Sequence, residues 1–399
     1  MKILVIDEEL PYPVNSGKRS RTFNLTRLLA SDNEITYLAY GTPDSESFRQ
    51  LRRHKISPVV VRPPQRTQAG VRFYARLLLN LFSPYPYIVT SHYTRRFRDR
   101  LNELLAASRY DVLICEWTPY AVFIRDLHGP ATVIVAHNIE SSIWRRYEAY
   151  EKNPLKKLYI AIQRRKVERF ERQCFGWADG ATAVSKEEAD AIEAYGAGYT
   201  VQVIENGVDM DYFRPQAADV NRDLVVFTGA MDWRPNQDAA RYFVENVFPL
   251  LRRRRPCMKA VLVGRNPTAQ VTSLARVDGV TVTGTVDDVR PYIARAAVYV
   301  VPLRIGGGSR LKILEAMAME KAVVSTSVGA EGLAVTDGDN IIIADGDESF
   351  ARSVLRCIDD EVLRQSVARG GRLLVESHYR WQTLAARLNR YLNSLAGGK

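Results

Sequence analysis

A glycine-rich turn followed by a lysine is the part of the sequence best suited to binding an anion. Gly306, Gly307 and Gly308 follow a run of apolar residues, and Ser309 can cap a helix that begins after them. Glycine lets the backbone approach a ligand closely, and the free N–H groups at a helix start attract anions. Lys312 adds a positive charge in the first turn of that helix. The pattern therefore predicts a site for a phosphate or diphosphate.

Glu315 extends this prediction from a phosphate to a nucleotide. It lies three residues after Lys312, so the two side chains share a helical face, and its carboxylate could accept hydrogen bonds from ribose hydroxyls. Arg304 and Arg310 lie on either side of the turn and would add positive charge. The spacing is neither GxxxxGK[ST] nor GxGxxG, so P-loop and dinucleotide motifs do not account for it. A Lys–Glu surface pair beside a flexible loop is the open alternative.

A second group of candidates follows predicted strands in the first half of the chain: Ser16, Gly17, Glu116, His137 and Asn138. Ligands of open parallel sheets bind at the carboxyl ends of the strands. His137 follows such a strand, where an imidazole that changes charge near neutral pH is useful, and Glu116 ends the strand before it. An ordinary strand–helix turn with a helix cap explains Ser16 and Gly17 equally well.

Two α/β series must position these residues, because short β-branched runs alternate with longer amphipathic segments. The first half predicts strands at 2–7, 34–39, 57–61, 112–115, 132–136, 180–184 and 201–204. Its predicted helices are 19–30, 71–81, 94–107, 119–127, 142–175 and 186–195. The second half predicts strands at 224–228, 259–263, 280–283, 298–301, 322–326 and 341–344.

A break in this pattern divides the chain. The polar run 206–223 lacks periodicity and reads as a linker. We therefore predict domains at 1–207 and 208–377, with a cleft between them. The amphipathic segment 378–396 either completes the second domain or packs back on the first, and its periodicity does not decide between them.

The composition limits the kind of partner. The 399 residues carry a formal net charge of +11, and 46% of them are hydrophobic, enough for two sizeable cores. This charge leaves nucleic acid, an anionic membrane surface and a phosphate-rich substrate open as partners. Four cysteines lie far apart without a CxxC pair, which argues against a zinc site or a disulfide framework; they are Cys115, Cys174, Cys257 and Cys357.

The sequence also bears on location. Its start, MKILVID, has the pattern of a first strand rather than a signal peptide, and no stretch reaches the roughly 18 uncharged apolar residues of a spanning helix. We therefore expect a cytoplasmic protein. The segment 144–175 combines basic with apolar residues, which suits peripheral contact with the anionic inner face of the plasma membrane. A long helix packed on its own domain explains this segment as well.

Several motifs in order give the chain a resemblance to a known family. The glycine-rich turn followed by Lys312–Ala318 resembles the donor-binding signature of family four retaining glycosyltransferases, which have the GT-B fold. Other segments that resemble this family are 203–209, 227–232, 287–292, 323–326 and 331–333. The first of these resembles the family's entry to the linker, and the second resembles the first strand of its donor domain.

The chain also departs from the family pattern. Many members carry two glutamates eight positions apart, and the first would fall at Gly307. The Arg and Lys that often follow the first donor-domain strand are missing, although Arg234 lies in that region as a second candidate for the phosphate charge. The resemblance therefore supports nucleotide diphosphate binding better than any particular sugar.

The resemblance implies a retaining transfer of a sugar from a UDP- or GDP-sugar to a glycan or lipid-linked acceptor. The first domain would bind the acceptor and the second the donor. His137, Gly17 and Lys312 would serve catalysis. No cofactor and no metal would be needed, because Lys312 and backbone amides would stabilise the leaving diphosphate.

Two alternatives remain open. A sugar-nucleotide epimerase of the same architecture would bind the same donor, whereas only a transferase releases free nucleoside diphosphate when an acceptor is added. A basic protein that binds nucleic acid or another anionic surface would also carry this charge. The sequence shows no aromatic-interleaved basic motif and no nucleic-acid module, so we expect no nucleic acid as partner.

Overall fold

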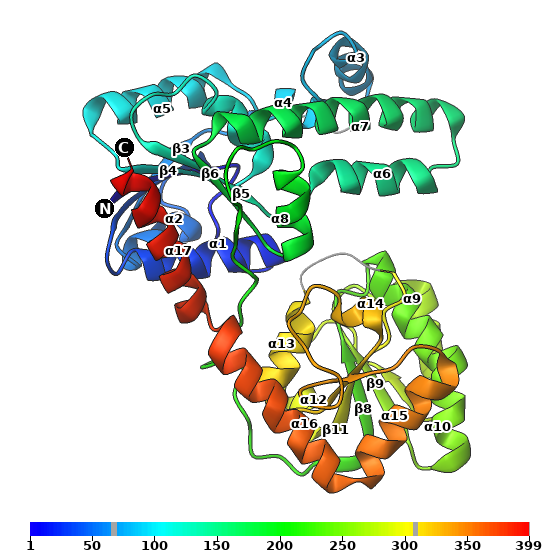
Figure 1. The fold of residues 1–399 in the computed structure, drawn as a ribbon. Helices are drawn as coiled ribbons and strands as arrows, with labels where there is room; N and C mark the ends of the chain where they lie inside the picture. The colour runs from blue at the N-terminus through cyan, green and yellow to red at the C-terminus, as the bar shows by residue number, and fades with distance from the viewer. Residues whose placement is uncertain (65–69, 306–309, 399) are drawn as a thin grey trace. The chain divides into compact units, whose positions relative to one another are not determined.

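The computed structural model describes residues 1–64, 70–305 and 310–398. The chain divides into two compact units (Figure 1). Unit 1 holds Met1–Glu205 together with the residues from Leu384 onward, and unit 2 holds Asn206–Thr383. Each unit is built around one parallel β-sheet. This arrangement confirms the predicted pair of α/β, Rossmann-like domains.

Unit 1 has a seven-stranded sheet in the order β3-β2-β1-β4-β5-β6-β7. The strands are β1 (Lys2–Asp7), β2 (Glu34–Tyr40), β3 (Ile56–Val61), β4 (Val112–Cys115), β5 (Ala131–Ala136), β6 (Gly180–Ala183) and β7 (Gln202–Val203). Their ends agree with the sequence prediction to within one residue. The central strands β1, β4 and β5 are nearly continuous buried apolar runs, as expected where helices cover both faces of a sheet. The strand order reverses between β1 and β4.

Helices cover both faces of this sheet. In Figure 1, α1 (Gly17–Leu29) and α17 (Trp381–Gly397) lie on one face and α5 (Arg95–Ala107) and α7 (Pro154–Cys174) on the other. The remaining helices of unit 1 are α2 (Glu46–Arg53), α3 (Val71–Asn80), α4 (Tyr87–Thr90), α6 (Glu140–Tyr150) and α8 (Lys186–Glu193), with short 3-10 helices at Thr118–Phe123 and Phe175–Trp177.

Two helix predictions in unit 1 were wrong in detail. The single helix predicted at 142–175 is two helices, α6 and α7, because Pro154 lacks the N–H that a helix interior needs. Asn153 instead caps α7, its side chain accepting hydrogen bonds from the N–H groups of Leu155 and Lys156. The helix predicted at 119–127 is a shorter 3-10 helix.

The last helix joins the two units by its path along the chain. α17 begins in unit 2, and from Leu384 its residues belong to unit 1. There it lies against β6, where a Cβ added to Gly180 would be 2.3 Å from the hydroxyl of Tyr391. Arg387 forms an ion pair of 2.6 Å with Glu205, the residue at which the chain leaves unit 1. The absence of a side chain at Gly180 thus lets α17 approach the sheet.

Unit 2 has a six-stranded sheet in the order β10-β9-β8-β11-β12-β13. Its strands are β8 (Asn221–Thr228), β9 (Lys259–Val263), β10 (Val280–Val282), β11 (Ala296–Val301), β12 (Val323–Ser325) and β13 (Ile342–Ile343). The strand order reverses between β8 and β11. The predicted linker 206–223 belongs to unit 2, where Val208 bridges Arg380 and β8 already begins at Asn221.

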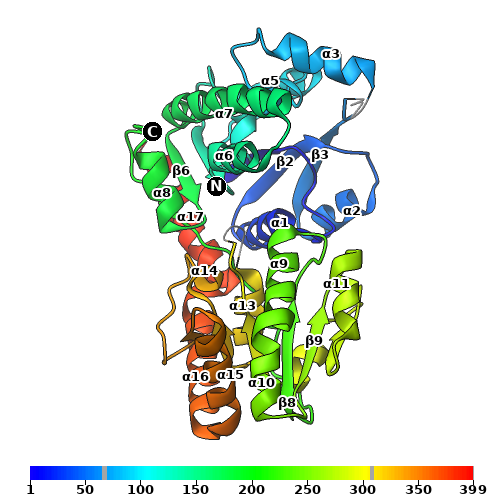
Figure 2. The same ribbon diagram turned by 90° about the vertical axis from the view of Figure 1, so that its right-hand side faces the viewer.

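The first helical segment of unit 2 has an apolar face turned into the core, since Ala239, Phe243, Val247 and Leu251 are all fully buried. This segment runs through α9 (Arg234–Tyr242), a π-helical turn (Phe243–Val247) and α10 (Phe248–Arg254), which lie together in Figure 2. The other helices are α11 (Ala269–Ser273), α12 (Arg290–Arg295), α13 (Leu311–Ala318), α14 (Ser327–Ala330), α15 (Asp347–Asp359) and α16 (Glu361–Leu374). Across the described residues, none of the helices is long and apolar enough to cross a membrane.

Two glycines bring together the loops that follow β8 and β9. A Cβ added to Gly264 would lie 1.7 Å from the carbonyl oxygen of Gly229. A Cβ added to Gly229 would itself lie 2.8 Å from Nζ of Lys312. The backbones of the two loops therefore approach each other at a distance that only glycine permits.

We expect Gly264→Ala to lower the free energy of unfolding by about 1–3 kcal/mol or more, because the added methyl group meets backbone that cannot rotate away. Thermal or urea unfolding of the purified variant measures this change. Gly176→Ala is the control, since a Cβ there has no heavy atom within 4 Å. Equal stability of the two variants would show that the loops can separate at no cost.

Candidate functional site

The main candidate site in unit 2 lies where the strand order reverses. Ligands of open α/β sheets bind at the carboxyl ends of the strands on either side of this point. Here these strands are β8 and β11, which α9 and α13 follow. Lys312 of α13 donates a hydrogen bond of 2.6 Å to Oδ1 of Asn236 in α9. A side chain of α13 is therefore hydrogen-bonded to a side chain of α9 at this position.

Asn236 holds Lys312 in place. It is 2% exposed, and its Nδ2 donates a hydrogen bond of 2.9 Å to the carbonyl oxygen of Ala230. The Nζ of Lys312 also lies 4.4 Å from the ring centroid of Phe227, in the range of a cation–π contact. Neither an amide oxygen nor a ring face carries a full charge. The ammonium group is therefore oriented without being neutralised by these two neighbours.

Desolvation changes the ionisation of both charged residues of α13. Burial lowers the pKa of Lys312 to about 7, a shift that Glu315 opposes and Arg310 reinforces. Burial also raises the pKa of Glu315 to about 7, and Lys312 opposes that shift. Both groups thus lose part of their charge near neutral pH. An anion bound beside Lys312 would restore its positive charge.

The two arginines predicted to help Lys312 are each paired with a carboxylate. Arg304 binds Asp238 through two hydrogen bonds of 2.7 and 3.0 Å. Arg310, which is buried, lies 2.9 Å from a carboxylate oxygen of Glu331. These ion pairs offset much of the charge of both arginines. Lys312 differs from them, because its ammonium contacts the neutral side chains of Asn236 and Phe227.

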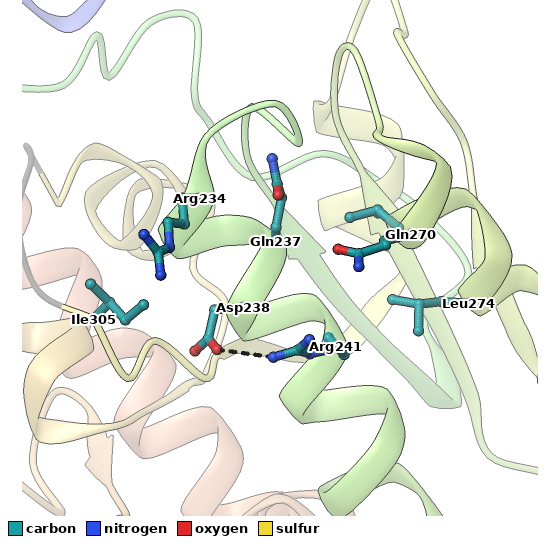
Figure 3. Close-up of a pocket in the computed structure, with 8 residues that line it drawn as sticks. Arg234, Gln237, Asp238, Arg241, Gln270, Leu274 and Ile305 are labelled. Carbon is teal, nitrogen blue, oxygen red and sulfur yellow. Dashed lines mark ion pairs between the residues drawn. The ribbon is translucent and has the colours of Figure 1, made fainter. Parts of the chain in front are cut away.

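Arg234 occupies a separate position at the start of α9. It lines a pocket of about 210 Å³ together with Asp238, Arg241 and Ile305. Figure 3 shows Arg234 and Ile305 on one side of this pocket and Gln270 and Leu274 on the other. Asp238 lies 3.8 Å from Arg241, so it is shared between that residue and Arg304. The remaining predicted residues of the turn, Gly306, Gly307, Gly308 and Ser309, lie outside the described residues.

The candidate site in unit 1 also lies where the strand order reverses. Asp7 ends β1, Glu116 follows β4 and His137 follows β5. Nε2 of His137 lies 3.2 Å from Oε2 of Glu116, and the hydroxyl of Thr22 donates a hydrogen bond of 3.1 Å to the same oxygen. The topology thus brings together Glu116 and His137, which the sequence predicted separately.

The ionisation of this pair fixes the form of the imidazole. Burial lowers the pKa of His137, although the hydrogen bond to Glu116 raises it. For Glu116, burial alone would raise the pKa, but the hydrogen bond to His137 and the charges of Arg21 and Lys18 outweigh burial and lower it. A neutral imidazole beside a carboxylate carries its proton on Nε2, so Nδ1 of His137 is left as an acceptor.

A partly buried ion cluster lies beside this pair. Lys18 of α1 forms ion pairs of 2.7 Å with Asp7 and 2.8 Å with Glu8, and its Nζ lies 5.3 Å from the ring centroid of Trp117. Burial would lower the pKa of Lys18, but the two carboxylates raise it, so the lysine stays charged. Burial raises the pKa of Asp7 to about 6 despite Lys18, and Tyr37 donates a hydrogen bond to it.

The other candidates of unit 1 have simpler positions. Ser16 caps α1 by accepting a hydrogen bond of 3.3 Å from the N–H of Arg19, and Gly17 is the first residue of that helix. Asn138 is partly buried and follows His137 directly, before α6 begins. The helix start at Gly17 lies in the segment that also carries Lys18.

Sequence reasoning missed Asn236, Asp7 and Lys18 as site residues. A signal was available for Asp7, because it ends a buried strand as His137 nearly does. For Lys18 the signal was its place directly after the glycine at the helix start. Asn236 gave no such signal, since only the contact between α9 and α13 shows what it does.

Two family models match successive parts of the chain. The model described as Glycosyltransferase Family 4 matches residues 17–212, and the model described as Glycosyl transferases group 1 matches residues 222–360. The first match covers most of unit 1, and the second covers the sheet of unit 2.

Curated relatives agree with these matches. An uncharacterised 44.6 kDa protein in the cps region of Klebsiella pneumoniae is 22% identical over 373 residues, which are 89% of this chain and 90% of that protein. A GDP-mannose-dependent alpha-(1-6)-phosphatidylinositol monomannoside mannosyltransferase of Mycobacterium tuberculosis is 28% identical over 224 residues. That alignment covers 50% of this chain and 57% of the mannosyltransferase, or about half of each.

Solved structures share the fold across the whole chain. Sucrose-phosphate synthase from Thermosynechococcus elongatus has a TM-score of 0.73 at 16% identity and covers 100% of both chains. HepE from Anabaena, solved in complex with UDP, has a TM-score of 0.67 at 16% identity and covers 99% of this chain and 100% of that one. The chain is therefore a glycosyltransferase of the GT-B fold, made of a Family 4 domain followed by a group 1 domain.

Proposed function

We propose that this glycosyltransferase moves a sugar from a nucleoside diphosphate sugar to an acceptor and retains the configuration at the anomeric carbon. The observation that carries the proposal is Lys312, which Asn236 and Phe227 orient at the point where the strand order of unit 2 reverses. A partly buried ammonium group whose direct contacts are neutral side chains is suited to a ligand that brings its own negative charge.

The proposed leaving group is a diphosphate, so the reaction depends on stabilising its growing charge. Lys312 supplies a positive charge, and binding of a phosphate would raise its pKa from about 7 and keep it protonated. The N–H groups at the start of α13 would add further donors. No step of this proposal uses a metal ion or another cofactor.

Glu315 completes the proposed nucleotide site. It lies one helical turn after Lys312, on the same face of α13. Ribose hydroxyls would donate hydrogen bonds to its carboxylate and thereby favour the ionised form, against the burial that raises its pKa. Arg234, Arg304 and Arg310 would add positive charge near the diphosphate. The charges of Arg304 and Arg310 are partly offset by their ion pairs with Asp238 and Glu331.

The comparisons support a UDP- or GDP-sugar as donor. HepE was solved with UDP, and the mycobacterial relative uses GDP-mannose. The relative in a cps region and the phosphatidylinositol mannoside relative support a glycan or a lipid-linked saccharide as acceptor. We further propose that the protein acts in the cytoplasm, in peripheral contact with the inner face of the plasma membrane.

His137 is the proposed contact to the transferred sugar or to the attacking acceptor. Its Nδ1 is an acceptor because Nε2 is directed to Glu116. Thr22 donates to the same carboxylate oxygen of Glu116, so two groups fix the orientation of that carboxylate. Glu116 therefore acts through His137, and Ser16 and Asn138 remain candidates for contacts to the acceptor.

Lys312→Ala is expected to weaken binding of UDP or GDP at least about tenfold, because a charge-assisted contact is worth about 1.5–3 kcal/mol. Isothermal titration calorimetry with each nucleoside diphosphate measures the change. The control is Lys259→Ala, which removes an exposed lysine at the opposite, amino end of β9. Unchanged affinity in Lys312→Ala would remove the donor site from α13.

The product is expected to keep the anomeric configuration of the donor. Proton NMR of the product, through the coupling constant of its anomeric proton, determines this configuration. An inverted product would reject the retaining mechanism while leaving the transferase activity intact. Conversion of the sugar nucleotide into an isomer, with no nucleoside diphosphate released when an acceptor is added, would instead favour an epimerase-type reaction.

Glu116→Gln is expected to lower the pKa of His137 further, because the carboxylate that opposes the effect of burial is lost. The protonated fraction of His137 at a given pH then decreases, and an NMR titration of its ring protons measures this shift. Glu8→Gln is the matched control, since Glu8 lies 3.5 Å from His92 instead. An unchanged pKa of His137 would mean that Glu116 does not set its ionisation.

A further inference from the structure

Exposed apolar side chains gather on α3 of unit 1. Five large apolar residues in and just after this helix are exposed by 62% to 89%; they are Val71, Tyr74, Leu78, Leu79 and Phe82. Four of them recur at intervals of three or four residues along the chain, so they form one stripe, called here the α3 stripe. Exposure of such a stripe to water is unfavourable in free energy unless another surface covers it.

The opposite face of α3 holds the helix on unit 1. Asn80 is buried; its Oδ1 accepts a hydrogen bond of 2.9 Å from Nε2 of Gln163 in α7, and its Nδ2 donates one of 2.9 Å to the hydroxyl of Thr90. Phe73 packs edge-on against Tyr87, with 6.3 Å between the ring centroids. The inward face of α3 therefore has its own partners, and the stripe is a second apolar face turned outward.

Lys166 fixes the end of α3 in the same way. Its Nζ donates hydrogen bonds of 2.6, 2.9 and 2.7 Å to the carbonyl oxygens of Asn80, Leu81 and Ser83. Asn80 is the last residue of α3, and Leu81 and Ser83 follow it in the chain. Figure 1 shows α3 lying beside α7, from which Lys166 comes. The stripe is thus presented by a helix that is tied down at one end.

The charged residues of the chain segment that carries the stripe have one sign. Arg72 and Arg76 are exposed on α3 and lie toward one edge of the stripe in a helical projection. The sequence from Ser47 to Arg98 contains several arginines and no Asp or Glu. An apolar face with positive charge at its edge is complementary to a surface that is apolar inside and anionic outside.

The first turns of α7 have the same character. Leu155 and Leu158 are exposed by 78% and 61%, and Lys156 and Lys157 are exposed between them. These residues belong to the segment 144–175, whose basic and apolar composition suggested membrane contact. Further along α7, Arg164 is paired with Glu148 and Lys166 caps α3, so these two charges serve the fold.

We propose that the α3 stripe inserts into the headgroup boundary of an anionic phospholipid bilayer, with Arg72 and Arg76 contacting lipid phosphates. A nucleic acid offers phosphates but no apolar layer to cover leucine and phenylalanine side chains. A second copy of the chain would bring a second set of arginines against the first, and like charges repel. This proposal does not depend on the reaction that the enzyme catalyses.

Vesicle flotation with the full-length protein tests the proposal. We expect the wild type to bind vesicles of phosphatidylcholine mixed with phosphatidylglycerol, and to bind vesicles of phosphatidylcholine alone much less. Leu78→Glu with Phe82→Glu is expected to reduce binding at least about tenfold, because two large apolar side chains lose their burial in lipid. Both positions are exposed, so an unchanged unfolding temperature is expected.

Two further variants separate the apolar and ionic parts. Val362→Glu, at an exposed apolar position of α16 in unit 2, is the control and is expected to bind like the wild type. Arg72→Gln with Arg76→Gln is expected to weaken binding to the anionic vesicles and to reduce its dependence on salt. This second pair tests the same surface without adding negative charge to it.

Three outcomes would overturn the proposal. In the first, the wild type binds neither kind of vesicle. In the second, the variant with Leu78→Glu and Phe82→Glu binds vesicles like the wild type. In the third, the wild type is a dimer in solution and this variant is a monomer. Stabilisation of the same proteins by UDP or GDP is measured in parallel. If neither UDP nor GDP stabilises any of these proteins while the wild type still binds vesicles, the proposed donor site is refuted and the proposed membrane surface is not.

Discussion

In both units the functional candidates depend on one constraint, the reversal of strand order in a parallel sheet. Helices that follow neighbouring strands normally lie on one face of the sheet and fill the space between them. Where the order reverses, the two following segments leave in opposite directions and keep polar side chains at the sheet edge. Lys312 and Asn236 meet at this position in unit 2. In unit 1 Thr22 of α1 meets Glu116, which follows β4, and Glu116 also contacts His137. Similar topology thus creates two different sites.

Each site contains a partly buried lysine, and the pKa values of the two lysines are shifted in opposite directions. Lys18 is surrounded by carboxylates that raise its pKa, whereas burial lowers the pKa of Lys312. A lysine that is already paired gains little from a phosphate, because its desolvation has been offset within the protein. A desolvated lysine beside an amide and a ring gains much more. This contrast explains why Lys312 rather than Lys18 is the better candidate for binding a phosphate, although both follow a glycine-containing turn.

The sequence was a good guide to the strands and a poorer one to the contacts. β1 and β4 were predicted to the residue, because a buried parallel strand is a continuous apolar run. α6 and α7 were predicted as one helix, because their amphipathic pattern continues through Pro154 and conceals the break. Glu116 and His137 were chosen as candidates from their positions after strands, and Lys312 from its place after the glycine-rich turn. The partners of Lys312 and His137 could not be predicted, because a hydrogen bond between distant segments leaves no local pattern.

The path of α17 has a consequence for how the protein is made. Unit 1 is completed only by residues from Leu384 onward, which leave the ribosome after all of unit 2. Until then Gly180 in β6 has no helix against it, and Glu205 lacks the ion pair with Arg387. Unit 2, by contrast, is one uninterrupted stretch of chain. During translation the unit that starts first should therefore be the last to finish folding, and a chaperone would meet it with part of its sheet uncovered.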